Sequence, residues 1–127
     1  MEKSLTAAQE FRDRALRGIA EARSHLQNGY LESAVSTAYY SCCYAIHSQL
    51  ASRGIEASSH KQAGIQFRRL FIKSKKLPAQ FSETWQQLSE WRMEADYDSS
   101  PDIDDPRAQE LVQLAEEFIT ELLKIRD

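Results

Sequence analysis

The chain has 127 residues and a formal net charge of −3, which predicts a single domain over residues 1–127. A chain of this length can bury a core without disulfides or metals. No apolar run approaches the roughly 18 residues of a membrane span, and the charged N-terminus excludes a secretory signal. Cys42 and Cys43 are adjacent, which disfavours a mutual disulfide and offers no metal-ligand spacing. We therefore expect a cytoplasmic protein with no membrane contact, no metal site and no cofactor.

The first half of the chain predicts two long helices. Apolar residues recur at spacings of three and four over residues 4–27, which indicates an amphipathic helix that ends at Asn28-Gly29. The short connection makes the next helix, residues 30–50, antiparallel to the first. This second helix carries no charge over residues 34–46, so we expect it to be buried on most of its circumference. Its tyrosines and His47 form either a polar network at a site or ordinary core packing with satisfied hydroxyls.

A third helix, over about residues 60–74, is predicted to follow a cap at Ser58 or Ser59. Its charge is one-sided, because no Asp or Glu occurs from residue 57 to residue 82. Cations near a helix C-terminus complement the helix dipole, but this set is larger than that role requires. The pattern indicates either a patch suited to phosphate or a merely solvated face. The cations are Lys61, Arg68, Arg69, Lys73, Lys75 and Lys76.

The predicted fourth helix, residues 79–97, contains the main anomaly of the sequence. Phe81, Trp85 and Leu88 form an apolar stripe whose next position is Arg92. An arginine on a core-facing stripe must find an anion or reach water, because a buried unpaired charge is costly. One interpretation is a local pair with Asp96, four residues later. The other places the guanidinium at an interface or cleft, where it meets a phosphate or a partner's carboxylate.

The last predicted helix begins at a cap at Asp104 or Asp105, with Pro106 in its first turn, and runs almost to Asp127. Five helical segments with short connections, and no strand pattern, predict an all-α fold. We expect five helices whose core is an antiparallel up-and-down four-helix bundle.

Three motifs carry a resemblance to a known family. The second helix reads S-x-A-Y-Y-S-C-C-Y-A over residues 36–45, His60 opens the third helix, and the fourth ends in R-M-E-A-D-Y from Arg92 to Tyr97. Together and in this order they resemble the HEPN domain family, over about residues 5–126. The similarity is to the prokaryotic stand-alone type, which is usually paired with a minimal nucleotidyltransferase.

The resemblance implies an all-α homodimer within a two-component, toxin–antitoxin-like module. Many family members are metal-independent ribonucleases, in which an Arg stabilises phosphate charge and a His four to six residues later serves in acid–base catalysis. Here Asp96, Tyr97 and Asp98 occupy those positions after Arg92, and no His follows His60. The resemblance therefore implies at most a metal-independent endoribonuclease, and the missing His argues against that activity.

The resemblance and the one-sided charge of the third helix together give candidate roles to single residues. Arg92, Asp96 and Tyr97 are the candidate catalytic residues. The candidates for binding nucleotide or RNA are His60, Lys61, Arg68, Arg69 and Tyr40. The first functional hypothesis is a HEPN subunit that is associated with RNA or nucleotide and binds a minimal nucleotidyltransferase. The alternatives are a non-catalytic nucleotide- or RNA-binding dimer and a purely structural interaction bundle.

Overall fold

The computed structural model describes residues 2–97 and 103–126, apart from the side chains of Ser4 and of residues 95–97. No strand occurs in these two ranges, so the prediction of an all-α fold with five helices is confirmed. The third helix ends in a short π-helical segment, η1. In chain order the elements are α1 (Glu2–Gln27), α2 (Leu31–Ala51), α3 (His60–Phe67), η1 (Arg68–Ile72), α4 (Gln80–Tyr97) and α5 (Asp105–Leu123).

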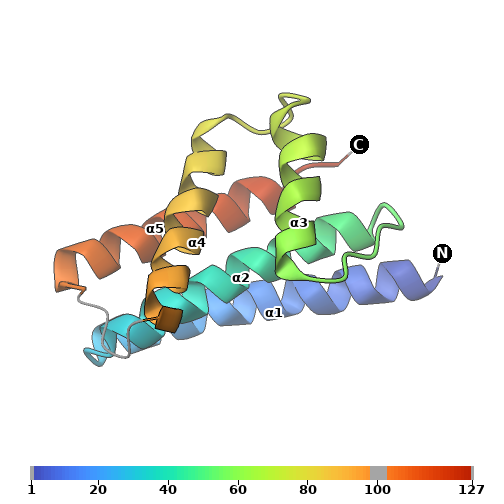
Figure 1. Ribbon diagram of the computed structural model, residues 1–127. Helices are drawn as coiled ribbons and strands as arrows, with labels where there is room; N and C mark the ends of the chain where they lie inside the picture. Colours follow the sequence, from blue (N-terminus) through green and yellow to red (C-terminus); the bar gives the residue numbers. More distant parts are fainter. Residues whose placement is uncertain (1, 98–102, 127) are drawn as a thin grey trace.

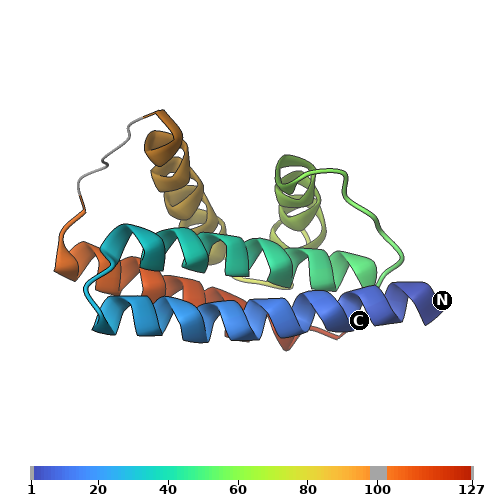
Figure 2. The same ribbon diagram turned by 90° about the horizontal axis from the view of Figure 1, so that it is seen from below.

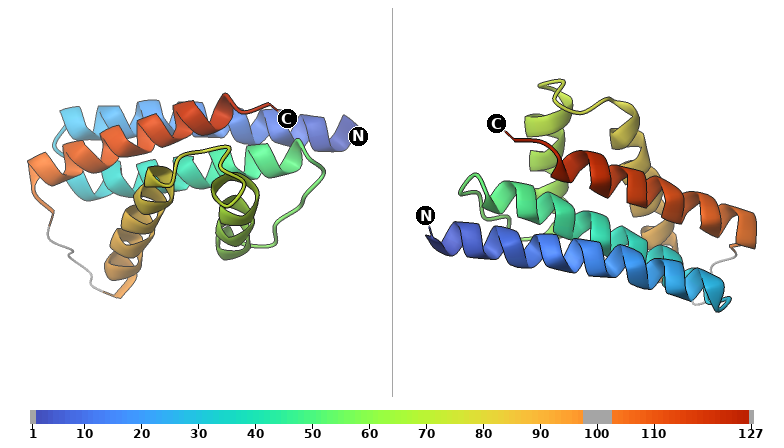
Figure 3. Two further views of the ribbon diagram at one scale, coloured as in Figure 1. Left: turned by 90° about the horizontal axis from the view of Figure 1, so that it is seen from above. Right: turned by 180° about the vertical axis from the view of Figure 1, so that it is seen from behind.

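The body of the bundle consists of α1, α2 and α5, which lie side by side (Figures 1 and 2). As predicted, α1 and α2 are antiparallel, but α5 runs in the same direction as α2 (Figure 1). The reason lies in the hairpin of α3 and α4, which crosses the other helices steeply on one side of the molecule (Figure 3). This hairpin returns the chain to the end where α2 begins. The helices therefore do not alternate as regularly as those of an up-and-down bundle.

Helix α2 is the central element that its uncharged sequence predicts. Ala34, Ala38, Cys42 and Ala45 are fully buried, and the helix packs against α1, α3, α4 and α5. Small residues let its neighbours approach closely. A methyl group at Gly18 of α1, for example, would overlap the hydroxyl of the buried Ser41.

Aromatic side chains join the hairpin to the body of the bundle. The ring of Phe118 on α5 lies 5.2 Å from that of Phe67 on α3, 6.4 Å from that of Phe81 and 6.3 Å from that of Trp85, centroid to centroid. Phe118 is fully buried, and Trp85 is 5% exposed. This cluster holds the end of α3 and the first turns of α4 on the bundle, and so positions the hairpin that the two helices form.

The predicted helix boundaries mostly match the structure. Gly29, with φ of 79°, follows α1 in the left-handed conformation, and the Ser59 side chain accepts a hydrogen bond from the backbone of Gln62 at the start of α3. Asp104 caps α5 in the same way. The prediction that the last helix runs almost to residue 127 is wrong, because α5 ends at Leu123. There the buried Gln49 amide of α2 donates to backbone carbonyls of the last turn and beyond, which replaces further helical hydrogen bonds.

The third helix differs from the continuous α-helix that was predicted. Over η1 the turn widens, and the backbone N–H of Lys73 donates to the carbonyl of Arg68, five residues earlier, at 2.9 Å. Ala63, Phe67 and Phe71 are all fully buried at steps of four residues. Such steps overshoot an α-helical turn of 3.6 residues. The wider turn cancels this drift, so that Phe71 stays directed into the core.

Candidate functional site

The anomalous Arg92 meets a tyrosine of the central helix. Its side chain is half-buried, its Nε donates a hydrogen bond to the Tyr40 hydroxyl at 3.1 Å, and its guanidinium carbon lies 5.5 Å from the centre of the same ring. The stripe that leads to it behaves as predicted, because Phe81, Trp85 and Leu88 are buried. The guanidinium therefore sits where the apolar stripe of α4 emerges from the core, against the partly exposed face of α2.

The other two members of the predicted catalytic set lie outside the described side chains. The backbone of Asp96 and Tyr97 closes α4, but nothing further is described for these residues, and Asp98 is outside the described ranges altogether. Both the local pairing of Arg92 with Asp96 and the catalytic roles of Asp96 and Tyr97 therefore stay predictions.

A histidine lies beside the same tyrosine. His60 is the first residue of α3, and its ring lies 5.7 Å from that of Tyr40 and 6.4 Å from that of Tyr44. Its Nδ1 is 3.2 Å from Nε2 of His47 on α2, which makes a hydrogen bond between the two imidazoles. Tyr40 thus contacts both Arg92 and His60. The structure brings together residues that are more than 50 positions apart in sequence, from α2, α3 and α4.

Two residues of α1 join this cluster, and the sequence patterns assigned neither of them to a site. Phe11 stacks on His47 at 5.1 Å and on Tyr44 at 6.2 Å, although its spacing indicated an ordinary core position. The guanidinium of Arg14 lies 5.6 Å from the Tyr44 ring and 6.0 Å from that of Phe11. Arg14 looked like a residue of the solvated face. Only the packing of α1 on α2 reveals its place, because nothing in the local spacing distinguishes it from the neighbouring arginines.

Burial lowers the pKa of both imidazoles of the pair. For His47 the loss of solvent is the main cause, and the nearby His60 adds to it; for His60 the cause is burial. Both groups are therefore neutral at pH 7, and each can then offer one donor and one acceptor nitrogen.

The first prediction concerns pH and stability. The pKa of each histidine is lower in the folded chain than its ordinary value near 6.5. Below that value the unfolded chain binds protons that the folded chain does not. The contribution of the two neutral histidines to the free energy of unfolding should therefore be fully present above pH about 6.5 and be lost as the pH falls below it. Urea denaturation at pH 7.5 and pH 5.5 would measure this loss.

In the same measurement a His47→Gln, His60→Gln double variant should lose less stability on acidification than the wild type. His25→Gln is the matched control, because His25 packs against Tyr30 and does not contact the pair. The double variant should also lose less stability on acidification than this control does. An unchanged pH dependence in the double variant would contradict the assignment of the acid-induced loss of stability to His47 and His60.

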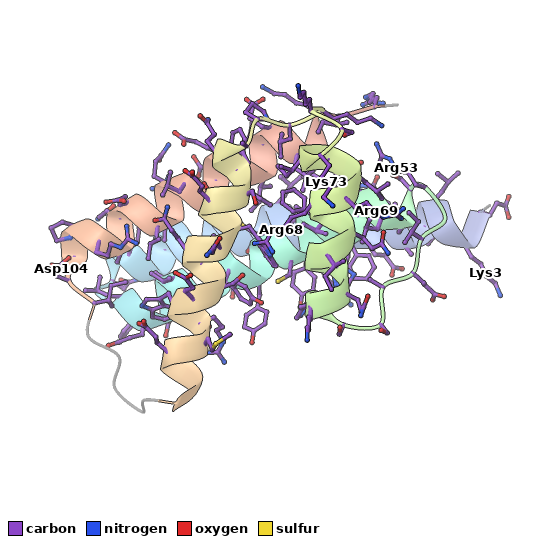
Figure 4. All side chains as sticks on the ribbon, turned by 45° about the horizontal axis from the view of Figure 1, so that its top comes forward. Lys3, Arg53, Arg68, Arg69, Lys73 and Asp104 are labelled. Atoms are coloured by element: carbon purple, nitrogen blue, oxygen red, sulfur yellow. The ribbon has the colours of Figure 1, made fainter. Side chains whose placement is uncertain are left out.

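A groove separates α3 from α4 and opens beside Arg92. Its volume is about 550 Å³, and Lys61, Arg68 and Arg92 supply its positive charge. The Nε of Arg68 donates to the Ser82 hydroxyl of α4 at 3.3 Å, so this side chain reaches across the groove (Figure 4). Arg69 projects from the other side of α3, where it binds the side chain of Gln66. The cations of the third helix therefore do not form one patch, and the groove receives only part of them.

A second hollow, of about 600 Å³, lies between α1 and α2. Tyr40 and Tyr44 line it, together with Arg14 and Arg17 of α1. Tyr40 thus stands between this hollow and the α3–α4 hairpin.

Cys42 and Cys43 are free, buried thiols, as predicted, and burial raises the pKa of Cys43 to about 12. The described part of the chain contains no group of three or more His, Cys, Asp or Glu residues that could hold a metal ion. Among its helices none is both long enough and apolar enough to cross a membrane.

Comparisons with known proteins cover the whole candidate site. A family model described as HEPN domain matches residues 8–125. A UPF0332 protein from Thermotoga maritima is 26% identical over 115 residues, which cover 91% of this chain and 87% of that protein. A protein of Methanocaldococcus jannaschii named "Putative toxin MJ0142" is 29% identical over 105 residues, or 82% of this chain and 71% of its own. The family match includes every residue of the cluster around Tyr40 and of the groove.

Proposed function

Because the chain belongs to the HEPN domain family, we propose that it is a toxin-like subunit that binds RNA phosphate at the candidate site. The toxin-like role is supported by the family match and by the name of the archaeal relative. A minimal nucleotidyltransferase is the proposed partner in a two-component module, and a second copy of the chain completes the proposed homodimer, with Arg92 near its two-fold axis.

One observation carries the proposal. The Arg92 guanidinium lies against Tyr40, the His60 ring contacts the same tyrosine, and Lys61 lines the adjoining groove. A planar guanidinium on an aromatic ring is held in a fixed orientation, which favours bidentate contacts with phosphate oxygens. The neutral imidazole of His60 adds a group that can accept or donate a proton beside that phosphate. We propose His60 for the acid–base role that the family's motif gives to a His later in the sequence.

The second prediction tests this site by RNA binding. The affinity of a labelled single-stranded RNA is measured by fluorescence anisotropy in EDTA, over NaCl concentrations from about 50 to about 200 mM. Arg92→Ala should weaken binding at least about tenfold, because hydrogen bonds to charged groups contribute roughly 1.5–3 kcal/mol. The slope of log affinity against log salt should fall by about 0.7, which corresponds to one lost phosphate contact on a single strand.

Arg107→Ala is the matched control for this experiment. It removes the same charge from α5, where Arg107 pairs with Glu110 at 2.6 Å and does not line the groove. Its RNA affinity should stay within about twofold of the wild type, since one distant surface charge is largely screened by salt. Equal losses in both variants, or no loss in Arg92→Ala, would contradict the proposal.

Light scattering on the same samples would report whether the mass is that of one 14.6 kDa chain or of two.

A second candidate function, a non-catalytic nucleotide- or RNA-binding dimer, is favoured by the absence of any His after His60. Incubation of the same RNA with the protein, without metal, distinguishes this function from that of a ribonuclease. Cleavage by the wild type that is lost in His60→Gln, while RNA binding remains, would assign ribonuclease activity with His60 in proton transfer. Intact RNA despite tight binding would assign the non-catalytic function.

A further inference from the structure

A further cavity lies at the end of the bundle where α1 begins and where α2 and α5 end (Figure 1). We call it the end cavity, and its volume is about 510 Å³. The first turns of α1, the last turn of α2 and the residues that follow α2 and α5 line it. None of them lines the groove between α3 and α4 or the hollow between α1 and α2. The end cavity is therefore separate from the candidate site.

Three arginines from three parts of the chain line the end cavity. Arg12 lies on α1, Arg53 follows α2 and Arg126 follows α5. Among the described residues that line the cavity there is no Asp or Glu. Within the described part of the chain Arg12 and Arg126 form no ion pair, whereas Arg23 and Arg107 each pair with a glutamate. Positive charge is thus concentrated at one concave site of a chain whose formal net charge is −3.

Two of these guanidinium groups are held in place by neighbouring groups. The guanidinium carbon of Arg53 lies 4.9 Å from the centre of the Phe71 ring, and its Nη1 donates to the backbone and side-chain carbonyl oxygens of Gln49 at 2.8 Å and 2.6 Å. The Nη1 of Arg12 donates to the carbonyl of Leu123 at 3.4 Å. Side chains that are already ordered lose less conformational entropy when they bind an anion.

The end cavity also has apolar walls. Leu5 of α1 is 56% exposed and lines the cavity together with Leu123, the last residue of α5, and Ile125. Exposed apolar side chains that share one concave site mark a binding surface more often than scattered ones do. A purely inorganic anion would leave these walls in water. The cavity therefore suits an anion that carries an apolar group.

We propose that the end cavity binds a small phosphate monoester, with the phosphate at the three arginines and the organic group against Leu5 and Ile125. A doubly charged phosphate suits three guanidinium groups better than a single carboxylate, and guanidinium binds phosphate oxygens in pairs. The volume lies within the usual range of small-ligand sites. The inference goes beyond the proposed function, because it assigns a second ligand to residues outside the site proposed for RNA phosphate.

The third prediction separates the charge of this ligand from its apolar group. Calorimetry at about pH 8 and constant ionic strength would compare phenyl phosphate, inorganic phosphate and benzoate. Phenyl phosphate should bind most tightly, and inorganic phosphate and benzoate should each bind about tenfold more weakly. Arg12→Gln should weaken the binding of phenyl phosphate at least about tenfold, because hydrogen bonds to charged groups contribute at this level. Leu5→Ser should weaken it about threefold and leave inorganic phosphate unchanged, because it removes only apolar contact.

Each variant has a matched control outside the end cavity. Arg107→Gln removes an arginine of α5 that pairs with Glu110, and Leu16→Ser removes a leucine of α1 that is 45% exposed. Both controls should bind the three probes like the wild type. An unchanged affinity for phenyl phosphate in Arg12→Gln, or an equal loss in Arg107→Gln, would overturn the inference. Circular dichroism on each variant would show whether it is folded.

Two-dimensional NMR spectra of the backbone amides locate the ligand on the wild type, without any substitution. Phenyl phosphate should cause its largest shifts within residues 5–12, 48–53 and 122–126. Largest shifts at Tyr40, His60 and Arg92 would instead place the phosphate at the candidate site and overturn the inference.

RNA binding distinguishes failure of this inference from failure of the proposed function. Arg12→Gln should keep its RNA affinity within about twofold of the wild type, since one distant charge is largely screened by salt. A loss as large as that in Arg92→Ala would overturn the inference, because the arginines of the end cavity would then serve RNA. RNA binding that depends on Arg92, in a protein that does not bind phenyl phosphate, would overturn only this inference.

Discussion

Replacing Phe118 by alanine is expected to lower the free energy of unfolding by about 3–5 kcal/mol, the usual cost of truncating a buried phenylalanine. The side chain is fully buried, and its ring contacts Phe67 of α3 as well as Phe81 and Trp85 of α4. The cavity would therefore open between three helices at once, and none of them could close it alone. Urea denaturation followed by circular dichroism would give the loss directly.

Glu117→Ala provides the comparison for this measurement, because Glu117 is exposed on the same helix. Its effect should stay within about 0.5 kcal/mol of zero. A loss below about 1 kcal/mol in Phe118→Ala would mean that the hairpin of α3 and α4 does not depend on this cluster. Other contacts would then position the groove.

Gly64→Leu should have the second large effect, and it should act on stability and on binding together. The Cβ of any residue here would lie 2.9 Å from Nε1 and 3.3 Å from Cζ2 of Trp85. Trp85 is buried, so α3 has to move away, at a cost of about 1–3 kcal/mol for overpacking, of which the higher helix propensity of leucine offsets less than about 1 kcal/mol. The leucine would also fill the groove. We therefore expect the affinity for RNA to fall by at least about tenfold, as read by fluorescence anisotropy alongside urea denaturation.

Two further variants sharpen this test. Gly64→Ala should be close to neutral in stability, since the gain of about 1 kcal/mol in helix propensity offsets the milder overlap. Gln62→Leu adds the same side chain as Gly64→Leu at an exposed position of α3, away from the indole. It should leave stability and binding near the wild-type values. If Gln62→Leu weakened both as much as Gly64→Leu, the contact with Trp85 would not be the cause.

The periodic parts of the fold could be predicted from the sequence. The absence of charge over residues 34–46 indicated the central helix. Caps were predicted at Ser58 or Ser59 and at Asp104 or Asp105, because these side chains can satisfy backbone donors at a helix start, and the structure has Ser59 and Asp104 in these roles. The direction of α5 could not be predicted in this way. It depends on the crossing of the α3–α4 hairpin, which follows from aromatic contacts between residues such as Phe67 and Phe118 that are distant in sequence.

The site was only partly predictable, for the same reason. Arg92 stood out because a charge interrupted an apolar stripe, and the stripe explains why it meets α2. The sequence could not show that Tyr40 contacts both Arg92 and His60. Arg14 had no signal at all, because its contact with Tyr44 depends on the rotation of α1 against α2. The sequence could not identify Ile65 and Met93 as groove residues, because they lie on two different helices and line the groove together only in the folded chain.

The π-helical segment η1 has a consequence for how the chain can vary in length. A π turn holds one residue more than the α turn that it replaces, and here the surplus lies between Arg68 and Ile72. Deleting one residue from this stretch would convert it into ordinary α-helix, while the parts on either side keep their orientation. Relatives one residue shorter at this point should therefore share the fold and the groove. Elsewhere in α3 the same deletion would turn His60 away from Tyr40 or Phe71 out of the core.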